Sequence, residues 1–193
     1  MKSLKMLGLA AVAAMAFTAF AVSSASATTL EVGGVTQAGA VTITASAEES
    51  TTLARTDGTF ANTCTVSHVH GTTTVLTGLT ITGPISSLTL TNCARPVTVH
   101  KPGAFEIIHI PGTTDGTVYW ENSETTMGSP FGTLNCKTGA TTHVGILTGV
   151  DGTPSTHATV DINAVTNCGF LVPSATWKGS LWITTPTGLG VSA

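Results

Sequence analysis

The sequence has little charge and few aromatic residues. Charged side chains make up 9% of the 193 residues and aromatic side chains 5%, with a single tyrosine. The chain therefore offers few charged side chains from which an active site with many catalytic groups could be built. The Gly-x-Ser-x-Gly, His-Glu-x-x-His and Ser-x-x-Lys patterns of common hydrolases are also missing. These absences favour a non-catalytic protein without a cofactor and leave a secreted enzyme as the alternative.

Long apolar runs are missing after residue 27, but one stands before it. The chain begins MKSLKMLGLAAVAAMAFTAFAVSSASA, so that Lys2 and Lys5 precede the apolar run. Ala25 and Ala27 occupy the small-residue positions that signal peptidase reads. We expect residues 1–27 to be a signal peptide that is cleaved after Ala27. The product is then a secreted or cell-surface protein without a transmembrane anchor.

Basic residues are scarce in the rest of the chain. Without residues 1–27, five basic side chains stand against ten acidic ones, a net charge of 5 − 10 = −5. The five are spread singly along the sequence, at Arg55, Arg95, Lys101, Lys137 and Lys178. Scattered cations on an acidic chain predict no electrostatic footprint for nucleic acid or for an anionic membrane. Nucleic acid is therefore not expected as a partner.

Threonine is abundant, with 39 residues, and it alternates with apolar residues. Residues 41–48 read Val-Thr-Ile-Thr-Ala-Ser-Ala-Glu, the period of a strand with one buried face. Residues 175–183 show the same period, with an inward set of Ala175, Trp177, Leu181 and Ile183. β-Branched side chains pack well on a pleated surface. The sequence predicts an all-β fold of about ten antiparallel strands, as a β-sandwich or alternatively a partly closed β-barrel.

Turn signals and cysteines suggest how the strands are organised. Turn pairs recur at Asp57-Gly58, Gly83-Pro84, Pro102-Gly103, Pro111-Gly112, Asp115-Gly116 and Asp151-Gly152. The segments 64–93 and 136–168 each run cysteine, His-Val, Leu-Thr-Gly, Thr-Asn-Cys. We interpret this pattern as an internal duplication within one β domain over residues 28–193. Residues 28–57 would form an N-terminal hairpin, 58–115 the first half and 116–193 the second half.

The four cysteines contain no Cys-x-x-Cys pair, which in an exported chain of this size points to two disulfides. Three connectivities are open. The duplication favours Cys64–Cys93 and Cys136–Cys168, because a duplicated unit would carry its own bridge. Each would close a loop of about 30 residues and contribute on the order of 3 to 4 kcal/mol in the chain-entropy estimate.

Residues 60–71, FANTCTVSHVHG, place a cysteine four residues before a His-x-His pair. If Cys64 is bridged, it is neither a metal ligand nor a nucleophile. His68 and His70 then remain as weak candidates for a metal site, on one face of a strand and roughly 7 Å apart between Cα atoms. A zinc or copper site needs a third and usually a fourth ligand, which no spacing supplies. We expect both to be ordinary strand histidines and no metal site.

Two aromatic residues are candidates for a contact surface. If Val118 and Trp120 face the core, Tyr119 faces outward. By the same alternation Trp182 points away from the side that holds Trp177. Outward aromatic residues on a sheet are frequent anchors of interactions.

Several segments resemble small secreted bacterial β-proteins rich in threonine, mostly uncharacterised. They are ATTLEVGGV after the apolar run, the two Thr-Asn-Cys triplets and the ending ATWKGSLWITTPTGLGVSA. More loosely, the chain is similar to the exported family named for its activation of alkane oxidation. The resemblance implies a secreted or surface-associated role, with hydrophobic substrates or adhesion, and transfers no site residue.

The function expected from the sequence is that of an exported, non-catalytic binding or structural protein. Its partner would be a cell-surface component, a hydrophobic ligand or a second copy of the chain. The alternative is a secreted enzyme or metal-binding protein that uses the strand histidines. The sequence does not distinguish among these partners.

Overall fold

The computed structural model describes residues 27–130, 132–150 and 156–193. The expected signal peptide lies outside the described residues except for Ala27. The described chain forms strands from Thr28 to Ser192, and the all-β prediction is confirmed. Within these ranges no helix is long and apolar enough to cross a bilayer.

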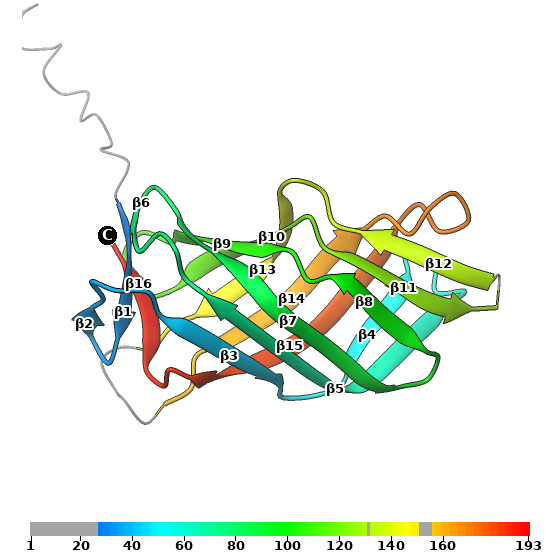
Figure 1. The fold of residues 1–193 in the computed structure, drawn as a ribbon, viewed down its shortest axis with the longest axis horizontal. Coiled ribbons are helices and arrows are strands. Elements are labelled where there is room, and N and C mark those ends of the chain that lie inside the picture. Colours follow the sequence, from blue (N-terminus) through cyan, green and yellow to red (C-terminus); the bar gives the residue numbers. More distant parts are fainter. Residues whose placement is uncertain (1–26, 131, 151–155) are drawn as a thin grey trace, which may run out of the picture.

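The largest sheet closes on itself into an eight-stranded antiparallel barrel (Figure 1). Its members are β3 (Thr42–Ala47), β4 (Thr51–Arg55), β5 (Ala61–Thr72), β7 (Ile81–Cys93), β9 (Ala104–His109), β10 (Gly116–Glu121), β13 (Thr142–Thr148), β14 (Thr159–Thr166) and β15 (Ala175–Thr185). From β4 onward each strand pairs with the next in this order, and β15 returns to pair with β3 and β4. The ring is closed because the last strand lies beside the first.

One position of the ring is shared by two strands. β3 pairs with β15 and with the end of β5, while β4 pairs with β15 and with the beginning of β5. Residues 48–50 separate the two strands. β3 and β4 therefore act as one interrupted strand, which explains how nine strands make eight positions.

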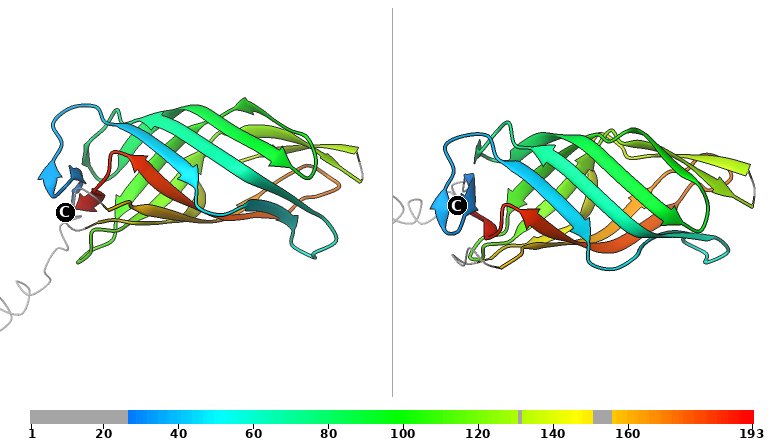
Figure 2. Two further views of the ribbon diagram at one scale, coloured as in Figure 1. Left: turned by 90° about the horizontal axis from the view of Figure 1, so that it is seen from below. Right: turned by 60° about the horizontal axis from the view of Figure 1, so that its bottom comes forward.

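A small sheet lies at each end of the barrel (Figure 2). One consists of β16 (Leu189–Ser192), β1 (Thr28–Val32), β2 (Val35–Thr36) and β6 (Thr77–Gly78). We call this end the cap end. The other sheet consists of β12 (Gly132–Lys137), β11 (Glu124–Ser129) and β8 (Val97–Lys101). We call this the disulfide end, because both disulfides lie there.

The barrel interior holds the main core, and the alternation seen in the sequence decides which side chains enter it. Ala45, Ile162, Leu181 and Ile183 are buried there, while their sequence neighbours point outward. A closed barrel of this kind is the alternative that the sequence left open. The preferred sandwich is wrong for the chain as a whole, because β15 has β3 and β4 as hydrogen-bonded neighbours instead of ending as a sheet edge.

Two-layer packing does occur, but only at the disulfide end. There the sheet of β8, β11 and β12 covers the ends of the long barrel strands. A second buried cluster fills the space between these layers; it contains Phe60, Met127, Leu134, Cys136, Cys168, Val172 and Ala175. Leu53 and Val97 pack against this cluster from opposite sides. The protein is thus a barrel at one end and a layered structure at the other.

The expected turn at Gly83-Pro84 is wrong, since both residues lie inside β7. A Cβ on Gly83 would sit 2.1 Å from the backbone oxygen of Thr72 and 2.8 Å from the Phe105 ring. The glycine is therefore required by close approach of backbone and ring instead of by a turn. Pro84 is tolerated because the ladder between β5 and β7 shifts register beside it, after His70.

The expected hairpin over residues 28–57 and the duplication also differ from the fold. β1 and β2 belong to the cap sheet, whereas β3 and β4 belong to the barrel. Cys64 and His68 share strand β5, but their expected counterparts Cys136 and His143 lie on β12 and β13. The strands of the two halves are therefore arranged differently, and the duplication stays a prediction.

Candidate binding face

The outer wall of the barrel brings several of the sequence candidates together. Trp182 pairs with Ser46, Ser46 with His68, and His68 with Thr89. The four residues form a row across β15, β3, β5 and β7. A second row contains Thr44 and His70, which are partners in the same ladder. We call these six residues, together with His157, the Trp182 face.

Trp182 is 43% exposed and has an aromatic neighbour. The rings of Trp182 and His157 are nearly parallel, with an interplanar angle of 4° and 5.9 Å between centroids. The Nδ1 atom of His157 lies 3.0 Å from the backbone oxygen of Ile183 and donates to it. This bond fixes the orientation of the imidazole. The imidazole therefore stacks on the indole and holds it in place, and this stacked pair is a preorganised aromatic platform that stays partly open to solvent.

Hydroxyl groups orient the two strand histidines of this face. The Nδ1 atom of His68 lies 2.9 Å from Ser46 Oγ, and that of His70 lies 3.2 Å from Thr44 Oγ1. Both imidazoles are exposed. Among the described residues no group of three or more His, Cys, Asp or Glu side chains is placed to hold a metal ion. The face can donate and accept hydrogen bonds, and it carries no Lys, Arg, Asp or Glu.

Tyr119, the second predicted contact residue, lies on another wall. It belongs to β10, which is separated from β15 by β13 and β14. Tyr119 is half-buried, and its ring meets that of His143 edge to face, with 5.6 Å between centroids. The structure therefore does not bring Tyr119 together with Trp182, and the two do not form one surface.

Two small cavities meet a pair of tryptophans: Trp120 lines one cavity and Trp177 lines the other. The rings of Trp120 and Trp177 are 5.0 Å apart, and Trp120 Nε1 donates to the oxygen of Pro102 over 2.6 Å. The cavity on the cap side has about 80 Å³ and is lined by apolar side chains such as Ile43, Val69 and Ile162. The other has about 50 Å³ and lies between the two layers of the disulfide end. Ligand pockets usually measure about 300 to 1,000 Å³, so this interior is a nearly filled core.

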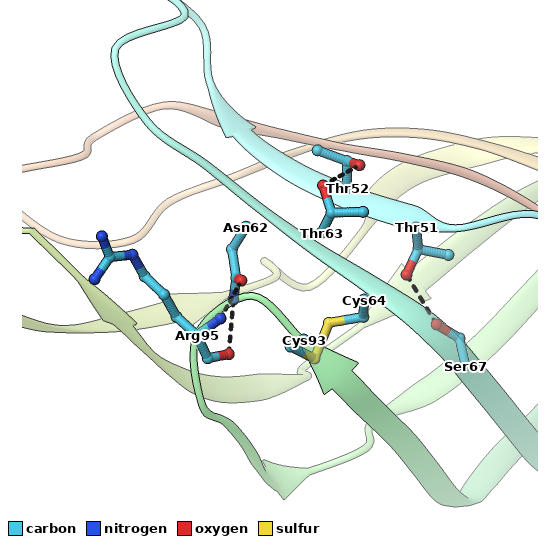
Figure 3. Close-up of a disulfide and its surroundings, with 8 residues drawn as sticks. All are labelled: Thr51, Thr52, Asn62, Thr63, Cys64, Ser67, Cys93 and Arg95. Carbon is cyan, nitrogen blue, oxygen red and sulfur yellow. Dashed lines mark hydrogen bonds between the residues drawn. A yellow bond between two sulfur atoms is a disulfide. The ribbon is translucent and has the colours of Figure 1, made fainter.

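The disulfides Cys64–Cys93 and Cys136–Cys168 are those favoured by the sequence, and both residues of each pair lie at the disulfide end. Figure 3 shows the first bridge, which joins directly opposite residues of β5 and β7. Disulfides of this kind are typical of an oxidising, extracellular environment. No described cysteine is free.

Polar groups around the first bridge are buried and paired (Figure 3). The hydroxyls of Thr51 and Ser67 are 2.8 Å apart, and both side chains are almost fully buried. The side-chain amide of Asn62 donates to the backbone oxygen of Arg95 and accepts from its backbone nitrogen. Asn62 thereby holds the connection between β7 and β8 against β5.

Two carboxyl groups of this end are shifted in their acidity. Hydrogen bonds from the Thr59 side chain and backbone lower the pKa of Asp57, and Arg55 adds an ion pair of 3.1 Å. The Asn135 amide and then the Lys137 ammonium lower the pKa of Glu124. All of these groups lie away from the Trp182 face. They are therefore structural features of the loops and of the sheet at the disulfide end.

Sequence reasoning missed a set of exposed apolar residues at the two ends of the barrel. Phe170 is 97% exposed and Leu171 is 52% exposed, at the tip of the loop between β14 and β15. At the cap end Val35 and Leu79 are 64% and 66% exposed. The signal for the tip was present in Gly169-Phe-Leu-Val-Pro173, where two large apolar residues stand between turn formers.

No family model, curated protein or solved structure matches this chain. The function must therefore be argued from the geometry of the molecule itself.

Proposed function

We propose that the protein is an exported, non-catalytic binding protein that attaches through the Trp182 face to a neutral polysaccharide. The parallel, solvent-facing rings of Trp182 and His157 carry this proposal. A flat aromatic surface stacks against the C–H face of a sugar ring, and the indole loses water only when such a contact forms. Attachment to a cell-surface component, one of the partners expected from the sequence, would follow from this chemistry.

The groups beside the platform support a neutral ligand. Ser46, His68 and Thr89 continue the row from Trp182, and hydroxyl and imidazole groups can bond sugar hydroxyls in either direction. Four strands span roughly 14 Å from the first to the last, which is the length of a few sugar units. An anionic polymer would find no cation within these rows.

Two competing functions have less support. A hydrophobic ligand inside the barrel would have to expand a cavity of about 80 Å³. A metal site on the strand histidines would need a third ligand beside His68 and His70, and the described residues hold no group of three or more His, Cys, Asp or Glu side chains placed for one. The resemblance to the exported alkane-oxidation family stays a prediction. Export by cleavage after Ala27 is part of the present proposal, and it is supported by the two disulfides.

The test is retention of the purified protein by insoluble neutral glucans and chitin. We expect Trp182→Ala to weaken retention about tenfold or more, since an anchor of this kind is worth 2 kcal/mol or more. Leu79→Ser is the matched control, because it removes a side chain that is 66% exposed and lies away from the Trp182 face. Equal retention of the wild type and Trp182→Ala, or no retention of the wild type by any of these polymers, would refute the proposal.

A further inference from the structure

Exposed apolar residues are distributed unevenly over the surface. Of the seven large apolar side chains that are exposed among the described residues, six lie at the ends of the barrel and one, Trp182, on its wall. The cap end carries Val35, Val75 and Leu79, and the disulfide end carries Val165, Phe170 and Leu171. Figure 1 shows these ends at opposite extremes of the long axis. Contact with water is unfavourable for such side chains, so exposed apolar residues at both ends point to a contact surface at each end.

The disulfide end presents its two foremost apolar residues on a rigid turn. The backbone nitrogen of Cys168 donates to Val172 over 3.0 Å, and that of Val172 donates back to Gly169 over 3.1 Å. Val172 is fully buried beneath the turn, and Cys168 is bridged to Cys136. These contacts hold Phe170 and Leu171 outward before any partner arrives. We call this turn, residues 168–172, the tip.

The cap end presents a hollow instead of a protrusion. It has about 550 Å³, is open to solvent and is lined by Val32, Gly33, Val35 and residues 184–187. Leu79 lies along the same edge of β1, because β2 and β6 both pair with that edge. Of the exposed apolar residues of this end, Val35 lines the hollow, whereas Leu79 lies beside Thr28 at the other end of β1.

The two ends also differ in charge. Residues 53–63, 91–101, 124–137 and 165–176 of the disulfide end contain four cations and two anions, so 4 − 2 = +2. Residues 28–36, 74–82, 109–116 and 184–193 of the cap end contain no Lys or Arg and two acids, Glu31 and Asp115, so −2. The sequence suggested scattered cations, but the fold gathers them on the side of the disulfides. The two ends carry opposite charge, and one protrudes where the other is hollow. The disulfide end of one molecule is therefore complementary to the cap end of another.

We infer that the tip of one molecule seats in the cap-end hollow of a second copy, so that molecules associate head to tail along the barrel axis. The interface joins two different surfaces, and such contacts continue into open chains unless a rotation closes them. It is small, so association rises gradually with concentration and weakens in high salt. Trp182 itself does not line the hollow, so every copy in such a chain keeps its Trp182 face. A chain of this kind would therefore carry many copies of that face.

A complementation experiment tests this arrangement, with sedimentation velocity of the secreted protein over a range of concentrations. The tip variant is Phe170→Ser with Leu171→Ser, and the hollow variant is Val35→Lys, which puts a cation into the lining of the hollow. We expect the wild type to form species larger than dimers and each variant alone to stay monomeric. An equal mixture of the two variants should form dimers and nothing larger, because only one intact tip and one intact hollow can meet in each pair.

Other outcomes overturn the inference. A wild type that is monomeric up to its solubility limit, or that instead binds phosphatidylglycerol vesicles through Phe170, shows that the tip does not seat in a second copy. Continued association of either variant, or a mixture that stays monomeric, shows that these two surfaces are not partners. Circular dichroism checks that the variants fold. Trp182→Ala should associate like the wild type, so that failure of polysaccharide binding and failure of association are separate results.

Discussion

The barrel and the disulfide end of this protein hold the edges and ends of their strands in different ways. In the barrel every strand has a neighbour on both sides, and the interior is almost entirely apolar. At the disulfide end the long strands extend beyond the closed ring and are covered by a separate three-stranded sheet. Both disulfides and most of the buried polar residues are found there, including Thr51, Asn62, Ser67 and Ser123.

The difference shows where a strand-rich chain needs covalent support. A closed ring has no edge to fray, so hydrogen bonding and burial suffice. An open pair of layers leaves strand ends that must be held together by other means. Cys64–Cys93 joins two neighbouring strands at that point, and Cys136–Cys168 ties the covering sheet to the loop after β14. The two regions should therefore respond differently to mutation.

Loss of the buried tryptophan that lines the cap-side cavity should have the largest effect. Trp120 is 5% exposed, contacts Trp177 and bonds Pro102. We expect Trp120→Ala to lower the free energy of unfolding by roughly 3 to 5 kcal/mol, because a large void remains in the barrel. Urea denaturation measures this loss. Trp182→Ala is the control and should cost less than about 1 kcal/mol; an equal cost would mean that Trp182 is a core residue.

Removal of either disulfide should affect mainly its own end. Replacement of both cysteines by alanine should cost about 2 to 4 kcal/mol for each bridge, since the loops of 29 and 32 residues are nearly equal. Hydrogen exchange should accelerate in β8, β11 and β12 while β9, β10 and β13 stay protected. If exchange instead rises equally in both regions, the disulfide end is not a separate unit of stability.

The buried hydroxyl pair beside the first disulfide should have an intermediate effect. Thr51→Val leaves the Ser67 hydroxyl without its 2.8 Å partner and should cost about 1 to 3 kcal/mol. The double variant Thr51→Val with Ser67→Ala should recover part of that loss, because no unpaired polar group remains. Denaturation midpoints of the two variants provide the comparison, and additive losses would argue against a direct hydrogen bond.

Changes on the outer wall should have little effect on folding. Replacement of His68 and His70 together by asparagine should change the free energy of unfolding by less than about 0.5 kcal/mol, since both rings are exposed. Thermal melting and the yield of secreted protein measure this. Stoichiometric zinc or copper in protein purified without a metal resin, lost in the double variant, would contradict it.

Acid should have the smallest effect, and only at the disulfide end. Asp57 and Glu124 have pKa values below their ordinary 3.8 and 4.5 when folded. A carboxyl of lowered pKa stabilises the fold above its unfolded value, and this contribution disappears as the pH falls through the folded value. In the variants Asp57→Asn and Asn135→Ala, the free energy of unfolding should therefore decrease slightly less than in the wild type as the pH falls below 4.5. If the free energy of unfolding depends on pH below 4.5 in both variants as it does in the wild type, these hydrogen bonds do not contribute to stability.

Local patterns in the sequence were sufficient for the strands and for the direction of their side chains. The period of two placed Ala45, Leu181 and Ile183 inside and Trp182 outside, because alternate Cβ atoms point to opposite faces. The same rule does not say which strand lies beside which. The disulfides illustrate this limit: the pairing was right, but the two halves from which it was inferred differ in the arrangement of their strands.

The candidate sites depended more strongly on strand order. Trp182, Ser46 and His68 are far apart in sequence and meet only because β15 closes the ring against β3. Tyr119 has the same local pattern as Trp182, yet strand order places it on another wall. The exposure of Phe170 depends on the turn beneath it, which is held by a bridge to a distant strand.

By itself, the sequence determined an all-β chain with alternating faces, because strand preference and side-chain direction follow from neighbouring residues, and its four cysteines indicated two disulfides. Only the tertiary structure decided between a sandwich and a barrel, since closure requires the first and last barrel strands to meet. It also decided which outward residues share a wall and that the tip and the hollow lie at opposite ends. These arrangements arise from pairing between strands that lie far apart along the chain, a pairing that no local pattern encodes.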